Sequence, residues 1–228
     1  MAETWQDIET LIKEIPEETC GGNQPEFVYQ LSRDTTGKGE VVEIGTNVGK
    51  TTIAMSFAQK EKQGNPIYTV DIYQHRDIEG NLERAGVSDY VHRIISSSSS
   101  AGWTWDKPVE LLWIDGDHCH IGAAVDIKAW MKHVVPGGRI ALHDYPGHRQ
   151  SLQVWRAVRA HLFGDPYRWR LVSDREAGSI IVFERLEGER PPFRWNETIY
   201  WLGRNLRALI FTGMPGLSKK LVDRVKNG

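Results

Sequence analysis

The chain has 228 residues and a formal net charge of −2 at pH 7, with 28 Lys and Arg against 30 Asp and Glu. This balance leaves no global basic field, so we expect no nucleic-acid partner. Every apolar run is far shorter than the roughly 20 residues that cross a bilayer, and the polar, acidic start of the chain does not resemble a signal peptide. The two cysteines, Cys20 and Cys119, lack the spacing of a metal site, and we expect a cytoplasmic protein.

The first 39 residues predict an N-terminal helical segment. Apolar side chains recur at helical spacing from residue 5 to residue 15, and Pro16 ends the pattern. Residues 26–32 predict a second, shorter helix. A polar link at residues 34–39 then leads into the first strand.

Between residues 40 and 187, short apolar runs alternate with amphipathic segments. The runs predict strands at residues 41–44, 66–71, 90–95, 110–114, 139–142, 169–172 and 179–184. Helices are expected at residues 51–58, 76–85, 121–134 and 151–163. This alternation is typical of an α/β domain with a mostly parallel sheet and helices on both faces.

Polar residues follow each of the first five predicted strands. They are Glu43, Asp71, a serine tract at residues 96–100, Asp115 and the pair His143 and Asp144. The carboxyl ends of parallel strands meet at one edge of a sheet, and ligands of such sheets bind there. The sequence therefore predicts one site at that edge.

The turn after the first strand has the pattern Glu-x-Gly-x-x-x-Gly. Gly45 and Gly49 let the backbone approach a ligand closely, and Thr46 and Asn47 lie between them. A phosphate-binding P-loop would need its first glycine one residue before Gly45, and a dinucleotide loop would need glycine in place of Asn47. An ordinary strand–helix turn is the remaining alternative to a cofactor loop.

Two further strand ends carry residues that suit a nucleotide-type ligand. Asp71 follows Gly45 at the distance at which such sites place an acid for ribose hydroxyls, and its alternative role is a helix N-cap. Ser98, within the serine tract, would either contact an adenine edge or only turn the chain.

Three ionisable groups, Asp115, Asp117 and His118, lie within four residues after the fourth predicted strand. Carboxylates this close raise each other's pKa unless a cation lies between them, and hard divalent ions bind such groups. Together with His143 and Asp144, Asp115 would form one face of a metal site. The alternatives are Asp144 alone, a hydrogen-bonding role for His143, and helix capping by Asp117.

Four motifs together resemble those of the Rossmann-like, S-adenosylmethionine-dependent methyltransferases of small molecules. They are residues 43–52, the IDGDH run at 114–118, the Pro-Gly-Gly at 136–138 and the Ala-Leu-His-Asp at 141–144. The branch with IDGDH and HD motifs, similar to the macrocin, mycinamicin and cephamycin-pathway methyltransferases, shares them over roughly residues 26–184. The resemblance implies a three-layer sandwich around a seven-stranded sheet of order 3-2-1-4-5-7-6, with the last strand antiparallel.

The resemblance also implies how the cofactor is held. Glu43, Gly45 and Asn47 would approach the methionine part of S-adenosylmethionine, and Asp71 would hold its ribose. Many relatives place an acid near Ser98, and this chain departs from them there.

The chemistry implied by the resemblance concerns a metal and a base. A divalent ion, usually magnesium, would lie on Asp115 and the pair His143 and Asp144. Relatives mostly have two acids at that pair, so His143 leaves a softer metal or no metal as alternatives. The catalytic base is implied at Asp117 or His118.

We therefore expect methyl transfer to a hydroxyl of a small molecule, of sugar or natural-product type, with His118 as general base and Asp117 as its rival. The alternatives are an amine acceptor, a P-loop-like nucleotide hydrolase that uses Lys50 and Thr51, and a non-catalytic cofactor-binding or membrane-surface protein. Residues 188–228 predict a basic amphipathic helical extension, with eight Lys and Arg against two acids after residue 189. We expect this extension to pack on the domain or to form a homo-oligomer, in preference to binding an anionic membrane.

Overall fold

A seven-stranded sheet crosses the protein in the order β3-β2-β1-β4-β5-β7-β6. The structure is a computed structural model, and it describes residues 3–16, 21–75, 77–145, 151–165, 168–174 and 177–188. The first five strands are parallel, β7 is antiparallel to β5, and β6 is antiparallel to β7. The predicted α/β fold and strand order are confirmed. The strands are β1 (Glu40–Ile44), β2 (Ile67–Asp71), β3 (Val91–Ile95), β4 (Val109–Ile114), β5 (Val134–Leu142), β6 (Trp169–Asp174) and β7 (Ile181–Arg185).

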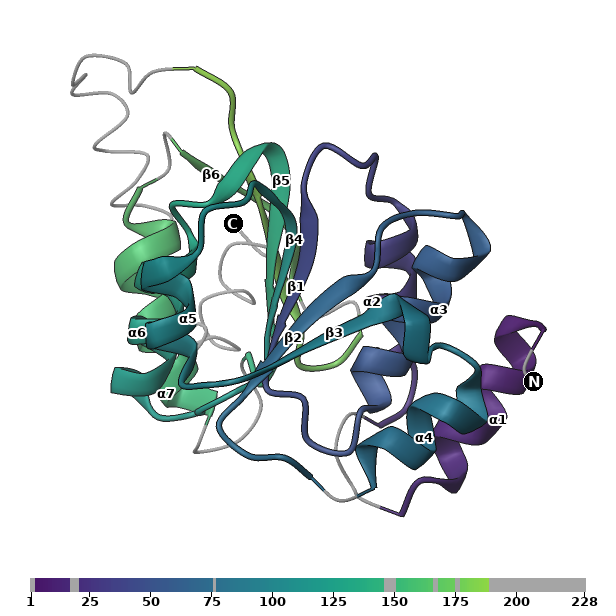
Figure 1. Ribbon diagram of the computed structural model, residues 1–228. Coiled ribbons are helices and arrows are strands. Elements are labelled where there is room, and N and C mark those ends of the chain that lie inside the picture. The colour runs from purple at the N-terminus through teal and green to yellow at the C-terminus, as the bar shows by residue number, and fades with distance from the viewer. Residues whose placement is uncertain are drawn as a thin grey trace, which may run out of the picture.

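Two layers of helices enclose the sheet (Figure 1). One layer holds α1 (Trp5–Glu14), α2 (Gln24–Arg33), α3 (Lys50–Glu61) and α4 (Ile78–Ala85). The other holds α5 (Ser98–Thr104), α6 (His120–Trp130) and α7 (Ser151–Val158), which a π-helical turn (Arg159–Phe163) extends. A 3-10 turn (Ser88–Tyr90) leads into β3.

The helices of the first layer pack on α3. Thr4 begins α1 with a capping box, in which its side chain accepts from the backbone N–H of Asp7 and the Asp7 carboxylate accepts from the Thr4 backbone. Ile8 and Tyr29 lie in one buried cluster with Phe57 of α3. Because α3 lies between the sheet and these two helices, its side chains are buried on nearly every face.

The second layer covers the other face of the sheet. Ile127 and Trp130 of α6 and Trp155 of α7 pack in one cluster with side chains of the central strands. This cluster is the largest of the described part of the chain, and it packs α6 against β4.

Two elements differ from the sequence prediction. The serine tract does not only turn the chain, because Ser98 begins α5. The helix expected at residues 121–134 ends at Trp130, and the Pro-Gly-Gly run lies inside β5. There the register shifts, with Val109 opposite Val134 and Leu111 opposite Arg139, so the run forms a bulge in which Gly137 takes a φ of +79°.

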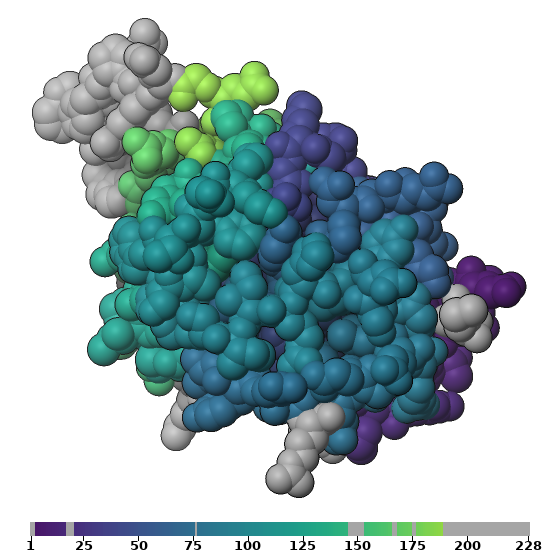
Figure 2. All heavy atoms as spheres, viewed as in Figure 1, coloured from purple at the N-terminus to yellow at the C-terminus, as the bar shows by residue number. Residues whose placement is uncertain are grey.

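The first helix and the last strands lie on opposite sides of the molecule (Figure 2). The predicted basic extension, residues 188–228, lies outside the described residues apart from Gly188. In the part of the chain that the structure describes, no helix has the length and apolar character to cross a membrane.

Candidate active site

A cavity of about 1030 Å³ opens at the carboxyl ends of the parallel strands. Its lining brings together ten of the twelve predicted site residues, which lie at or just after the ends of β1 to β5. They are Gly45, Thr46, Asn47, Asp71, Ser98, Asp115, Asp117, His118, His143 and Asp144, with Glu43 and Gly49 outside the lining.

Ser98, predicted as a cofactor contact, is among the residues of the lining. Residues distant in the chain therefore meet in one cavity, as the alternation of strands and helices predicts.

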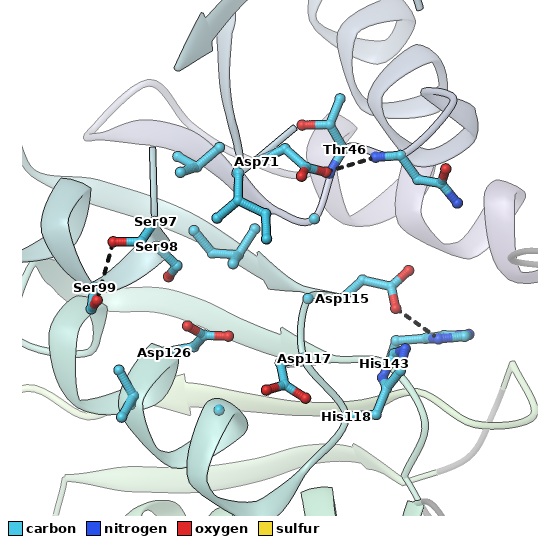
Figure 3. A pocket seen from close by; sticks show the side chains of 18 of the residues that line it. Thr46, Asp71, Ser97, Ser98, Ser99, Asp115, Asp117, His118, Asp126 and His143 are labelled. Atoms are coloured by element: carbon cyan, nitrogen blue, oxygen red, sulfur yellow. Dashed lines mark hydrogen bonds and ion pairs between the residues drawn. The ribbon is translucent and has the colours of Figure 1, made fainter. Parts of the chain in front are cut away.

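The glycine loop between β1 and α3 closes one wall of this cavity. Gly45 has a φ of +93°, and a Cβ on it would lie 2.2 Å from the carbonyl oxygen of Asp115, so no larger residue fits. The backbone N–H groups of Thr46 and Asn47 donate to Oδ2 of Asp71, at 2.9 and 3.1 Å. Asp71 thus fixes the loop and also faces the cavity (Figure 3).

Glu43 lies beneath the loop and is fully buried. The hydroxyls of Thr51, Thr52 and Thr69 donate to its carboxylate at 2.5 to 2.6 Å. Burial raises the pKa of Glu43 to about 7; the three hydroxyls lower it, and the charge of Asp115 raises it further. Glu43 reaches the cavity only through Thr51, which lines it.

Gly49 also lies outside the lining, and its role here is packing. It has a φ of +89° and immediately precedes α3. A Cβ on it would lie 2.5 Å from the side chain of Ile78 in α4, so a glycine allows the two helices to approach.

The serine tract supplies the end of the cavity beside α5. Ser97 caps α5 by accepting from the backbone N–H of Ser100. Ser98 accepts from the indole N–H of Trp130, at 3.0 Å, and its hydroxyl donates to Asp126. Asp126 of α6 is only 6% exposed and lines the cavity, although the sequence analysis did not identify it. The signal was an acid on the helix face that also carries Trp130.

Asp117 shapes the turn before α6. Its carboxylate accepts from the backbone N–H of Cys119 at 2.8 Å and from the Cys119 thiol at 3.1 Å. These hydrogen bonds lower its pKa below the ordinary value. A carboxylate that is held this way is a weak proton acceptor, so the geometry favours His118 over Asp117 as the base.

Four side chains pair with one another at the far end of the cavity. Nδ1 of His118 lies 3.1 Å from Oδ2 of Asp144. Nδ1 of His143 lies 3.0 Å from Oδ1 of Asp115 and 3.6 Å from Oδ1 of Asp144. The cluster is therefore a row of alternating imidazoles and carboxylates, which Figure 3 shows in part.

His143 is the most enclosed member of this cluster. Its side chain is 12% exposed, and its Nε2 lies 3.2 Å from the side-chain oxygen of Gln24 and 3.3 Å from Oγ of Ser179. Burial lowers the pKa of His143, but the adjacent carboxylates of Asp115 and Asp144 outweigh burial, and the net shift is upward. His143 thus lies between two carboxylates, whose charges favour its protonated form.

This arrangement does not fit a magnesium site. Mg²⁺ requires near-octahedral oxygen ligands at about 2.0–2.1 Å. Here the His143 imidazole faces both Asp115 and Asp144, and His118 takes the other oxygen of Asp144. Within the described ranges, no group of three or more His, Cys, Asp or Glu side chains is arranged to hold a metal ion.

Comparison with known proteins assigns the domain. Residues 42–145, which carry every predicted site residue, match the family described as a methyltransferase domain. A relative from Acanthamoeba polyphaga mimivirus, named uncharacterized protein R132, is 25% identical over 154 residues. The match covers 63% of this chain and 63% of that relative, so the chain spans less than two thirds of its length.

Solved structures share the fold at low sequence identity. The O-methyltransferase TomG from Streptomyces achromogenes, involved in tomaymycin synthesis and solved with S-adenosylmethionine, superposes with a TM-score of 0.62 and 16% identity, over 82% of this chain and 91% of that one. An O-methyltransferase from Bacillus cereus, solved with S-adenosylhomocysteine, gives a TM-score of 0.58 and 16% identity, over 82% and 93% of the two chains.

The fold and the matched domain point in the same direction. The strand order and the cavity at the strand ends are those of the Rossmann-like methyltransferases. Residues 42–145 thus match a methyltransferase domain within the fold that such enzymes share.

Proposed function

We propose that the protein transfers the methyl group of S-adenosylmethionine to a hydroxyl of a small molecule, of sugar or natural-product type. The observation that carries this proposal is the contact between His118 and Asp144, 3.1 Å apart at the cavity wall. With Nδ1 held by Asp144, Nε2 of His118 is the ring nitrogen that can accept a proton. The relatives solved as O-methyltransferases support oxygen as the acceptor atom.

The cofactor is expected to lie along the glycine loop. Asp71 faces the cavity at the end of β2 and suits the two ribose hydroxyls, since a carboxylate accepts hydrogen bonds from both. The backbone of Gly45 and Thr46 would then face the methionine part. The sulfonium would lie toward Asp115, because the methyl group must reach the end of the cavity that holds His118.

The reaction is a direct displacement. The acceptor oxygen attacks the methyl carbon, the bond between carbon and sulfur breaks, and S-adenosylhomocysteine leaves as a neutral thioether. The hydroxyl proton passes to Nε2 of His118, and Asp144 stabilises the resulting imidazolium. Holding the oxygen in line with the methyl group, at about 3 Å, supplies much of the rate enhancement.

Calorimetry and methyl incorporation test this proposal together. The protein should bind S-adenosylhomocysteine, and radiolabelled methyl should pass from S-adenosylmethionine to one member of a panel of sugars and phenols. A panel of amines in the same assay tests nitrogen as the acceptor atom. Binding of ATP in place of S-adenosylhomocysteine, lost in Lys50→Ala, would support the nucleotide-hydrolase alternative and contradict the proposal.

Cofactor binding without methyl transfer to any compound would instead favour the non-catalytic alternative. The same outcome with vesicle binding that requires residues 188–228 would point to a membrane surface. A sedimentation mass equal to that of a single chain at every concentration would contradict the expected homo-oligomer.

A further inference from the structure

His143 is held through the ring nitrogen that does not face its two carboxylates. Nε2 of His143 lies 3.2 Å from Oε1 of Gln24 and 3.3 Å from Oγ of Ser179. The Gln24 amide nitrogen donates to the same Oγ at 2.9 Å, so the amide oxygen is the atom that faces the imidazole. The three side chains therefore form a closed triangle of hydrogen bonds on one side of the ring.

The two partners of His143 in this triangle come from outside the matched residues 42–145. Gln24 is the first residue of α2, and Ser179 lies between β6 and β7. Gly178 has a φ of +79°, which turns the chain just before Ser179. Two segments that are distant in sequence from the strand ends thus contact the site.

Ser179 also holds the backbone beside His143. Its carbonyl oxygen accepts from the backbone N–H of Tyr145 at 2.7 Å. Between these two positions, Asp144 has a φ of +56°, a left-handed conformation that Asp adopts more readily than most residues. Ser179 therefore contacts the chain on both sides of Asp144, whose carboxylate faces two imidazoles.

The other side of the His143 ring faces the carboxylates. Nδ1 lies 3.0 Å from Oδ1 of Asp115, the contact that Figure 3 shows, and 3.6 Å from Oδ1 of Asp144. An ion such as Mg²⁺ or Ca²⁺ on both carboxylates would need this space, since its oxygen ligands lie about 2.0–2.6 Å from it. The imidazole can leave only by turning, which would break its hydrogen bonds to Gln24 and Ser179.

We infer that Gln24 and Ser179 are positioning residues that keep the His143 imidazole in the space between its two carboxylates. The ring then keeps a divalent ion away from these carboxylates. Asp144 meanwhile keeps its other oxygen for Nδ1 of His118, 3.1 Å away. The effect of this positioning on methyl transfer rests on the proposed function, whereas its effect on ion binding does not.

Mn²⁺ is the probe for ion binding, because the electron paramagnetic resonance signal of the free ion reports how much is bound. The wild type should bind Mn²⁺ weakly. His143→Ala removes the ring and should bind Mn²⁺ at least about tenfold more tightly. Gln24→Leu lets the ring turn and should strengthen Mn²⁺ binding by about threefold. Gln30→Leu, at an exposed position of the same helix, should keep the wild-type affinity.

Kinetics of methyl transfer provide a readout that loss of folding alone would not give. Gln24→Leu should lower kcat by about tenfold and leave the Kd for S-adenosylhomocysteine within about twofold, because the ring no longer fixes Asp144 and His118. Gln24→Glu keeps an oxygen that accepts from Nε2 and from the Ser179 hydroxyl, so it should restore most of kcat. Ser179→Ala keeps the backbone carbonyl and should lower kcat by only about threefold.

Three outcomes would overturn the inference. Tight Mn²⁺ binding by the wild type that His143→Ala weakens would show that His143 is a metal ligand. Wild-type kcat and Mn²⁺ affinity in Gln24→Leu would show that Gln24 does not hold the ring. Equal losses of kcat in Gln24→Leu and Gln24→Glu, with lower melting temperatures in both, would show a structural role only. Absence of methyl transfer in the wild type would contradict the proposed function instead, and the Mn²⁺ affinities would still decide this inference.

Discussion

The carboxylates at the ends of β1 and β2 differ in their surroundings from those at the ends of β4 and β5. Glu43 and Asp71 accept hydrogen bonds from threonine hydroxyls and backbone N–H groups, and they hold the glycine loop. Asp115 and Asp144 lie against imidazoles instead. The first region therefore fixes the shape of the cofactor site, whereas the second region contains groups that can exchange protons. Binding and chemistry should be separable by mutation.

Replacement of His118 should separate cofactor binding from methyl transfer most strongly. Loss of a general base costs about 10²- to 10⁴-fold in rate, so His118→Ala should lower kcat by at least about 100-fold. The affinity for S-adenosylhomocysteine should stay within about twofold of wild type, since the cofactor contacts come from the other region. Single-turnover methyl transfer and calorimetry measure the two quantities.

His120→Ala is the matched control, because His120 is exposed and lies outside the cavity lining. It should keep wild-type turnover. Full turnover in His118→Ala would remove His118 from the mechanism, and Asp117→Asn would then be the next variant to assay.

Replacement of Asp71 should weaken cofactor binding more than it slows methyl transfer. Asp71→Asn keeps the shape of the side chain but removes the charge that accepts from Thr46, Asn47 and Tyr73. We expect the Kd for S-adenosylhomocysteine to rise by about tenfold or more, with a smaller change in kcat at saturating cofactor. The surface variant Asp89→Asn should leave both unchanged. A large fall in kcat with an unaltered Kd for S-adenosylhomocysteine would contradict the separate roles of the two regions.

Glu43 predicts a pH dependence of stability. Its pKa rises from 4.5 to about 7 on folding, so between these values the unfolded chain loses its proton first. The contribution of Glu43 to the free energy of unfolding should therefore be largest below pH 4.5. It should fall as the pH rises to 7, by up to about 3 kcal/mol.

Glu43→Gln removes this titration and keeps an acceptor for the threonines. In urea unfolding, the variant should gain stability relative to wild type between pH 5 and pH 8. Parallel stability curves for the two proteins would show that Glu43 is already ionised in the folded protein at pH 5. The exposed Glu83→Gln serves as the control.

Chelation should have the smallest effect. Because imidazoles already pair with Asp115 and Asp144, dialysis against EDTA should change the rate of methyl transfer by less than about twofold. Loss of activity that returns with Mg²⁺ would show that His143 and His118 move away from the carboxylates in the working enzyme.

The sequence predicted the fold and the location of the site more fully than the orientation of side chains. Strand alternation placed Asp71, Asp115 and Asp144 at one edge, and the structure brings them to one cavity. Glu43 was expected at the ligand, yet the three threonines that enclose it come from α3 and β2. The orientation of the Glu43 side chain depends on that tertiary packing, which no local sequence pattern specifies.

Asp126 and the Pro-Gly-Gly bulge are two further features that the sequence alone did not predict. Asp126 reaches the cavity because Gly116 leaves space and Ser98 lies opposite, and those three residues are distant in sequence. The Pro-Gly-Gly run is a common helix stop, but pairing of Val134 with Val109 starts β5 before it. Tertiary contacts between distant parts of the chain decided both features.

A crystal structure with S-adenosylhomocysteine tests the central claim most directly. We predict ribose hydroxyls on the Asp71 carboxylate, the adenine beside the serine tract, and the sulfur atom directed toward Asp115 and His118. A ligand in the reverse direction, with adenine beside His118, or one bound outside this cavity, would contradict the assignment of the two regions.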